Sequence, residues 1–89
     1  MISRTTTRFR EAYRRLPDHV QRRAREAYRR FKENPQHRSL RLKHVHANRP
    51  IYAVRVGLGH RALGIVEGDV MVWFWIGTHA EYDRLLSTL

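Results

Sequence analysis

The stretch Asp69-Val-Met-Val-Trp-Phe-Trp-Ile-Gly-Thr-His-Ala-Glu-Tyr-Asp83 runs from a turn, through an apolar strand, to a polar segment. At period two its apolar side chains divide between two faces, Val70, Val72, Phe74 and Ile76 on one and Met71, Trp73 and Trp75 on the other. A strand that is apolar on both faces is typical of a central position covered on both sides. We therefore expect the fold to be organised around this strand. Gly77 breaks the pattern, and residues 78–82 are expected to open a short helix.

The composition describes one small domain. The chain has 89 residues, of which 42% are hydrophobic, enough for a compact core. It has no cysteine, which excludes a disulfide framework and thiolate catalysis. The N-terminal residues lack the apolar segment of a secretion signal, so none is expected. The longest apolar run, residues 70–76, is too short to span a bilayer, so no membrane partner is expected.

The charge is strongly positive and unevenly distributed. Eighteen basic residues stand against eight acidic ones, a formal net charge of +10. Residues 1–34 hold eleven basic and four acidic residues, so most of the excess lies in the first third of the chain. An excess this large exceeds what solubility requires and favours a polyanionic partner, either a nucleic acid or an acidic protein segment.

Two amphipathic helices are expected before the strands. Residues 2–6 form either a short first strand or an unpaired terminus, and Thr6 or Thr7 is expected to cap the first helix. Apolar stripes recur at helical spacing, with Phe9, Tyr13 and Leu16 in the first helix and Val20, Ala24, Ala27, Tyr28 and Phe31 in the second. Pro17 either ends the first helix or opens the second, and Asn34-Pro35 ends the second. So short a link predicts an antiparallel helical hairpin with an arginine-rich outer face.

Four strands are expected after the loop at residues 35–38, because the apolar period changes to two. The expected strands cover residues 40–45, 51–56, 61–66 and 70–76. In the second, Tyr52, Val54 and Val56 fall on one face and Ala53 and Arg55 on the other. The turns at residues 46–50, 57–59 and 67–69 are too short for anything but antiparallel neighbours. Helices followed by such a meander predict an α+β fold rather than an α/β fold.

Ordered segments of the chain carry a resemblance to a known family. After the basic helical hairpin they are Leu40-Arg-Leu-Lys-His-Val45, Tyr52-Ala-Val-Arg-Val-Gly57, His60-Arg-Ala-Leu-Gly64, Glu67-Gly-Asp69 and Trp75-Ile-Gly-Thr-His-Ala-Glu-Tyr82. This order resembles the RelE/ParE superfamily of bacterial type II toxin–antitoxin toxins over nearly the whole chain. The resemblance implies a helical hairpin packed on a twisted antiparallel sheet of about four strands, with a short C-terminal helix. It also implies a cytoplasmic protein that forms a hetero-oligomer with an acidic antitoxin.

The same resemblance implies a site for RNA cleavage. RelE-like members cut mRNA, usually in the ribosomal A site, without a metal or other cofactor. By position, Arg61 matches the arginine that opens the third strand of the meander, and His79 and Tyr82 match the C-terminal basic residue and tyrosine. These matches imply that His79 acts as the general acid or base, that Arg61 stabilises the transition state and that Arg55 holds the phosphate. Tyr82 would donate a proton to the leaving group or stack on a base.

Further contacts with mRNA and ribosomal RNA are expected from His60, Lys43 and Arg41. Glu81 would orient the base or act in its place. The pair His44 and His46 has a spacing that suits a metal, but it lacks a third ligand nearby, so a pair on the strand surface is expected instead.

Structural alternatives remain open for each residue. Arg61 could pair with Glu67 or Asp69 on the surface, Tyr82 could be a core residue of the last helix, and His79 could be a helix N-terminal residue without a catalytic role. Two alternatives of function also remain. ParE-like members of the superfamily inhibit DNA gyrase and are not nucleases, and the chain could instead be an inactive basic partner of an acidic antitoxin.

Overall fold

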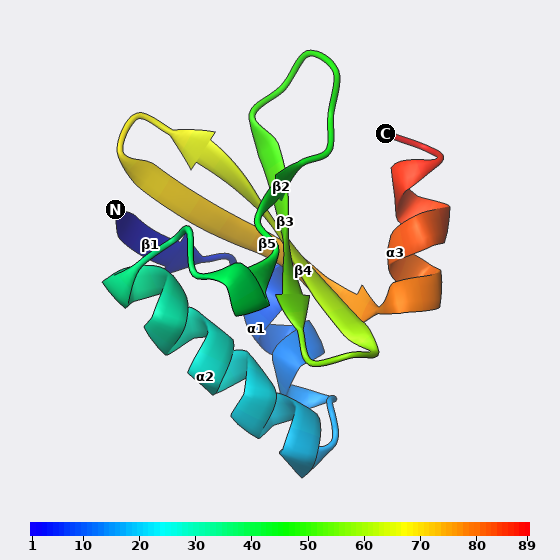
Figure 1. Cartoon of the computed structure of the whole chain (residues 1–89). Coiled ribbons are helices and arrows are strands. Elements are labelled where there is room, and N and C mark those ends of the chain that lie inside the picture. The colour runs from blue at the N-terminus through cyan, green and yellow to red at the C-terminus, as the bar shows by residue number, and fades with distance from the viewer.

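The computed structural model describes all residues 1–89 and contains one five-stranded sheet with three α-helices (Figure 1). The strands are β1 (Ile2–Thr5), β2 (Lys43–His44), β3 (Ile51–Val56), β4 (His60–Glu67) and β5 (Val70–Thr78). The helices are α1 (Thr7–Arg14), α2 (Asp18–Glu33) and α3 (His79–Leu86), with a 3-10 turn η1 (Arg38–Leu40) before β2. This arrangement confirms the predicted α+β class. None of the helices is both long and apolar enough to cross a membrane.

The strand order β1-β5-β4-β3-β2 explains the apolar character of β5. The predicted meander is present, since β3, β4 and β5 pair antiparallel in sequence and β2 pairs antiparallel with β3. The N-terminal residues form an additional strand, β1, which pairs parallel with β5 from Ile2 opposite Val70 to Thr5 opposite Trp73. The sheet is therefore mixed, and β5 has a neighbour on each side, as its sequence predicts.

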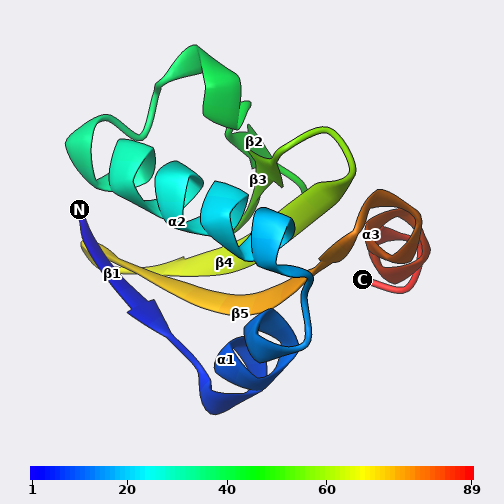
Figure 2. The same cartoon turned by 90° about the horizontal axis from the view of Figure 1, so that it is seen from below.

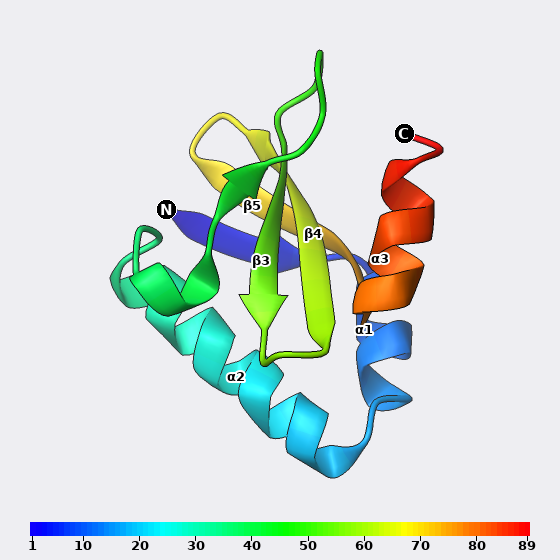
Figure 3. The same ribbon diagram turned by 45° about the vertical axis from the view of Figure 1, so that its right-hand side comes forward.

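Side chains fix both ends of α1 in the helical hairpin. At its start, Thr6 is the N-cap, and its Oγ1 accepts from the Phe9 N–H at 3.1 Å. Gln21 Nε2 donates to the carbonyls of Tyr13 and Leu16, both at 3.1 Å, which satisfies the open end of α1. From this turn the two helices diverge as a V (Figure 3).

The first core lies between this hairpin and one face of the sheet. Its buried members come from α2, η1 and β3–β5 and are Ala27, Phe31, Leu40, Val54, Val56, Ala62, Met71, Trp73 and Ile76. Phe31 packs edge-to-face on Trp73, with ring centroids 5.1 Å apart. Figure 2 shows α2 crossing β4 and α1 beside β5, with α3 set apart from both. Tyr28 belongs to the apolar stripe predicted for α2, but its side chain is exposed and lies beneath Lys32 Nζ.

A second, smaller core lies on the opposite face, where α3 packs against β4 and β5. Its buried members are Ile51, Ala53, Leu63 and Tyr82. Figures 1 and 3 show α2 and α3 on opposite sides of β3 and β4. The face of the sheet that carries α3 is called the α3 face below, and it is the face on which the candidate site lies.

A β-bulge changes the predicted faces of β5. Leu63 pairs with Trp75, but the next residue, Gly64, pairs with Trp73, so Phe74 is an extra residue in β5. Beyond the bulge the alternation is inverted. Ile76 therefore joins the first core with Met71 and Trp73, while Trp75 packs against the second core, opposite to the prediction.

The predicted strand at residues 40–45 is mostly wrong. Leu40 ends the 3-10 turn η1 and is buried, and Arg41 adopts a left-handed conformation with φ of 47°. This conformation turns the chain before it can pair, so β2 contains only Lys43 and His44. As a consequence, the last half of β3 pairs with β4 but has no neighbouring strand on its other edge, since β2 reaches only Tyr52 and Ala53.

The bulge also explains why position 64 is glycine. A Cβ at Gly64 would lie 2.6 Å from Met71 Sδ and 2.8 Å from the Trp73 ring. Since Trp73 is buried and cannot move freely, Gly64→Ala is expected to lower the free energy of unfolding by about 1–3 kcal/mol. Urea denaturation measures this change. Gly59→Ala is the matched control, because nothing lies within 4 Å of a Cβ at that position, and an equal loss in both variants would contradict the packing explanation.

Candidate active site

Two arginines lie directly opposite each other on neighbouring strands of the α3 face. Arg55 of β3 pairs in register with Arg61 of β4. Ala53 and Leu63, which belong to the second core, form the preceding row on the same face. Both arginines are half-buried, and no carboxylate lies within ion-pair distance of either guanidinium. The pair is therefore a concentrated positive charge that an anion from outside the chain can neutralise.

Arg61 is the centre of this charge. Its pKa is lowered, first by burial and then by the positive charges of Arg55 and Arg41, while Tyr82 and Asp83 act in the opposite direction. The Nη1 group of Arg61 donates to the His60 carbonyl at 2.7 Å, which fixes the guanidinium near the end of β4. An arginine that is partly desolvated and surrounded by like charge gains from binding a phosphate.

His79 is the first residue of α3 and lies at the end of β5. Its backbone N–H donates to the Gly59 carbonyl at 2.9 Å, which fastens the start of α3 to the β3–β4 turn. Its Nδ1 lies 3.1 Å from Asp83 Oδ2, and its ring contacts the Tyr82 ring edge-to-face with centroids 5.7 Å apart. The His79 side chain is 47% exposed, so its ring remains accessible.

Tyr82 and Asp83 connect the histidine to the arginines. Both are next to His79 through the contacts above, and both lie near enough to Arg61 to affect its pKa. Tyr82 is buried in the second core, and burial raises the pKa of its hydroxyl. The interpretation of Tyr82 as a core residue is thus confirmed for its ring. The raised pKa leaves the hydroxyl protonated at neutral pH, as in an ordinary tyrosine, and makes it a weaker acid.

The sheet brings together all but one of the predicted site residues. Lys43 lies opposite Ala53, so it is on the α3 face beside Arg55, and the charge of Arg41 acts on Arg61. His60 is the exception. It pairs with Val56, a residue of the first core, and therefore lies on the opposite face. There its neighbours include His19 and Arg23 of α2.

Two other interpretations do not agree with the structure. Glu81 does not face the arginines. Its Oε1 accepts from the Thr78 N–H at 2.8 Å and from Thr78 Oγ1 at 2.9 Å, forming the capping box of α3. Arg61 does not pair with Glu67 or Asp69, because these lie at the other end of β4.

The two histidines of the β2–β3 loop make local contacts. His44 Nε2 bonds the Arg49 carbonyl at 2.8 Å, and the His44 ring stacks on Tyr52. His46 Nδ1 accepts from the N–H groups of Asn48 and Arg49. These bonds give both histidines a role in shaping the loop.

Asp83 is a residue of the candidate site that was not predicted from the sequence. It lies four residues after His79, and residues at i and i+4 are neighbours on a helix. The pattern His-x-x-x-Asp at the start of a predicted helix was the signal that could have identified it.

His60 makes a pH-dependent contribution to stability. Its pKa is lowered below the ordinary value of 6.5, first by burial, with His19 and Arg23 acting in the same direction and Glu81 opposing. As the pH falls through 6.5, the unfolded chain binds a proton at this residue that the folded chain resists, so the free energy of unfolding decreases. His60→Gln is expected to reduce this decrease in urea denaturation compared between pH 7.5 and pH 5.5. The same pH dependence in both proteins would contradict the assignment.

Comparisons with known proteins agree on the fold. The RelB–RelE antitoxin–toxin complex of Methanococcus jannaschii contains a chain that matches with a TM-score of 0.69 and 20% identity, covering 91% of this chain and 96% of that one. The YoeB/ParE toxin of Agrobacterium tumefaciens matches with a TM-score of 0.72 and 15% identity over 89% and 99%. The isolated RelE toxin of E. coli matches with a TM-score of 0.68 and 15% identity over 99% and 98%.

At the level of sequence, no curated protein matches the chain. The family model of the ParE-like toxin domain does match, over residues 18–84, which include α2, the four strands β2–β5 and most of α3. The match covers the arginine pair of the α3 face and the start of α3 with His79. The chain therefore belongs to the ParE-like toxin domain family, within the RelE/ParE superfamily of toxins of toxin–antitoxin systems.

Proposed function

We propose that this toxin is an endoribonuclease that cleaves mRNA on the ribosome and so inhibits translation. The observation that supports this most is the shared position of an unneutralised arginine pair and a histidine–aspartate pair on the α3 face. Cleavage of RNA needs a base, a proton donor and positive charge beside one phosphate. Arg55 and Arg61 offer the charge, and the first turn of α3 offers the other two.

The proposed reaction is an attack of the 2′-oxygen on the adjacent phosphorus. With the Nδ1–H of His79 donating to Asp83, Nε2 carries a lone pair and takes the proton from the 2′-hydroxyl. The 2′-oxygen forms its bond to phosphorus while the bond to the 5′-oxygen breaks. Tyr82 gives its proton to the leaving 5′-oxygen. The products are a 2′,3′-cyclic phosphate and a 5′-hydroxyl, and Arg61 stabilises the negative charge that gathers on the non-bridging oxygens of the phosphate.

The proposed partner that restrains this activity is an acidic antitoxin. The net charge of +10 favours such a partner. Among the structural relatives, the RelE chains of Methanococcus jannaschii and Pyrococcus horikoshii occur in complexes with RelB. If the product of a neighbouring gene is a small acidic protein that copurifies with this chain, the proposal of an antitoxin partner is supported, and the absence of such a protein would count against it.

Inhibition of DNA gyrase is the second candidate function, because the matching family model is that of a ParE-like toxin. The two functions would have different effects when the protein is induced in cells. If the chain cleaves mRNA, induction stops incorporation of labelled methionine within minutes and leaves mRNA fragments. If the chain inhibits gyrase, induction causes filamentation and an SOS response while mRNA stays intact. The second pattern would contradict the nuclease proposal.

A further inference from the structure

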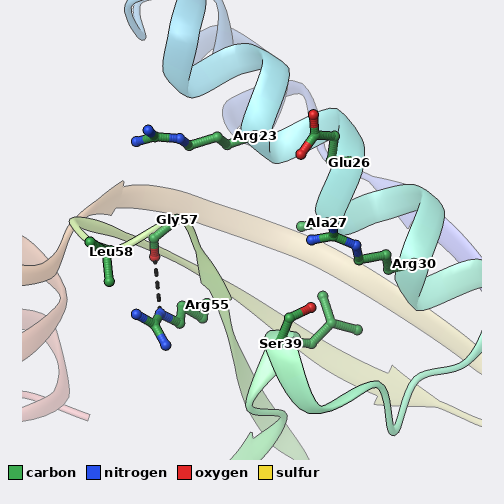
Figure 4. Close-up of a pocket in the computed structure, with 9 residues that line it drawn as sticks. Arg23, Glu26, Ala27, Arg30, Ser39, Arg55, Gly57 and Leu58 are labelled. Atoms are coloured by element: carbon green, nitrogen blue, oxygen red, sulfur yellow. Dashed lines mark hydrogen bonds between the residues drawn. The ribbon is translucent and has the colours of Figure 1, made fainter.

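A cavity of about 280 Å³ lies between α2, η1 and the end of β3 (Figure 4). Its walls carry three arginines, Arg23 and Arg30 from α2 and Arg55 from β3, against a single acidic residue, Glu26. Of these only Arg55 belongs to the site described above. The cavity therefore extends the positive charge of the α3 face around the edge of the sheet to α2.

The fold explains why these residues meet. Arg23 and Arg30 are seven residues apart, so they lie on the same face of α2, two turns from each other. The short β2 leaves the end of β3 uncovered, which opens the cavity on that side. Gly57 joins the two walls, because its carbonyl accepts from Arg55 Nε at 3.3 Å and the Arg23 side chain occupies the space beside it where a Cβ would lie. A Cβ at Gly57 would lie only 2.8 Å from Arg23 Cδ, and φ there is +64°.

The guanidinium groups of the cavity are not neutralised from within the chain. No carboxylate of the protein lies within ion-pair distance of an arginine, so Glu26 does not neutralise the arginines of the cavity. Among the residues drawn in Figure 4, the one hydrogen bond is that of Arg55 Nε to Gly57. The donors of Arg23 and Arg30 and the terminal nitrogens of Arg55 are thus free to bind an anion.

We propose that this cavity binds a phosphate group. Planar guanidinium groups bind phosphate oxygens with two parallel hydrogen bonds, so arginines on the walls of one cavity favour a phosphate, either free or in a phosphodiester, over a simple ion such as chloride. The volume is just below the usual range for drug-sized ligands, about 300–1,000 Å³, so it fits a phosphate with part of an attached sugar. The phosphate belongs either to an RNA backbone that continues from the α3 face or to a free phosphate compound.

This proposal does not depend on the cleavage chemistry, because Arg23, Arg30 and Gly57 are not part of the proposed active site. A chain that binds phosphate but cuts no RNA would retain this inference and lose the proposed function. If the chain cuts RNA but has no phosphate site in this cavity, the proposed function is retained and this inference is lost.

The test compares two double variants of α2 that remove the same charge. Arg23→Gln/Arg30→Gln removes the two cavity arginines of α2, whereas Arg22→Gln/Arg29→Gln removes two exposed arginines of the same helix that do not line the cavity. Calorimetric titration with inorganic phosphate is expected to show one saturable site in the unaltered protein. The first variant is expected to weaken binding at least about tenfold, from the loss of charge-assisted hydrogen bonds, and the second less than about twofold. Equal thermal unfolding midpoints verify that both variants are folded.

A short 2′-O-methyl oligoribonucleotide, which cannot be cleaved, distinguishes the two sources of phosphate. If the cavity binds the RNA backbone, the first variant weakens oligonucleotide binding much more than the second. If it binds a free compound, the first variant loses phosphate binding and both variants bind the oligonucleotide alike. Either result supports a phosphate site. The inference is overturned if the unaltered protein shows no saturable phosphate binding, or if both variants lose it equally, since that would be the effect of overall charge.

Discussion

Replacing His79 by alanine is expected to lower the rate of RNA cleavage by about 10²–10⁴-fold, the usual contribution of a general acid or base. The side chain is about half exposed and its one hydrogen bond is to exposed Asp83. The variant should therefore unfold within about 1 kcal/mol of the unaltered protein. Single-turnover cleavage of mRNA on ribosomes measures the rate, and urea denaturation measures the stability.

His19→Ala is the matched control, since His19 is an exposed histidine on α2, away from the α3 face. It should cleave RNA at the rate of the unaltered protein. Asp83→Asn tests the role given to Asp83 as a positioning residue, because it keeps the size of the side chain while weakening its hold on the Nδ1–H of His79. It should lower the rate less than His79→Ala and change the pH dependence of cleavage. Full activity of His79→Ala would exclude the proposed chemistry.

Replacing Arg61 by alanine is expected to lower the rate of cleavage by about 10²–10³-fold, the effect of losing one donor that stabilises transition-state charge. Arg61 lies at the centre of the positive charge, where Arg55 and Arg41 act on it and no carboxylate neutralises it. Because a lysine cannot make two parallel hydrogen bonds to a phosphate, Arg61→Lys should restore only a small part of the rate. Separate measurement of kcat and KM shows the loss mainly in kcat.

Arg49→Ala provides the control for this prediction. Arg49 is an exposed arginine in the β2–β3 loop, and its removal changes the net charge by the same amount. Its effect should remain within about twofold at physiological salt, where charges far from the site are screened. Equal losses in Arg49→Ala and Arg61→Ala would mean that overall charge, rather than a positioned guanidinium, supports activity.

The parts of the fold that the sequence predicts well are those in which local pattern and packing agree. Residues 51–56 alternate cleanly between an apolar face and a face that carries Arg55, and β3 has those bounds. Residues 78–82 were expected to open a short helix, and α3 begins directly after Thr78. The turn at residues 67–69 is short enough to fix an antiparallel hairpin, and the chain reverses at Gly68 and Asp69.

The parts that the sequence does not predict depend on contacts between distant segments. The parallel pairing of β1 depends on a neighbour almost seventy residues away. The bulge in β5 depends on Gly64 of the next strand, where no side chain would fit, and it reverses the faces of Trp75 and Ile76. The strand expected at residues 40–45 is interrupted by the left-handed conformation of Arg41, which alternating apolar residues do not reveal.

In the candidate site, too, the local pattern predicts some features and contacts between distant segments determine the others. Arg55 and Arg61 were expected to lie near each other, and the short turn between their strands places them in register. His60 precedes Arg61 in the chain and for that reason lies on the opposite face, since successive residues of a strand alternate. The hydrogen bond of His79 with Asp83 has helical spacing, but its importance becomes clear only when Tyr82 and Asp83 are seen beside Arg61.

Purified protein shows whether side chains on the α3 face cleave RNA. The chain is incubated with ribosomes translating a defined mRNA in magnesium buffer, and in parallel with a short RNA in excess EDTA. We expect fragments ending in 2′,3′-cyclic phosphate in the ribosome reaction and their loss in His79→Ala and Arg61→Ala. We also expect slow cleavage of the short RNA that EDTA does not abolish. The proposal of RNA cleavage would be contradicted if the unaltered protein left the mRNA intact and the same sample inhibited gyrase supercoiling.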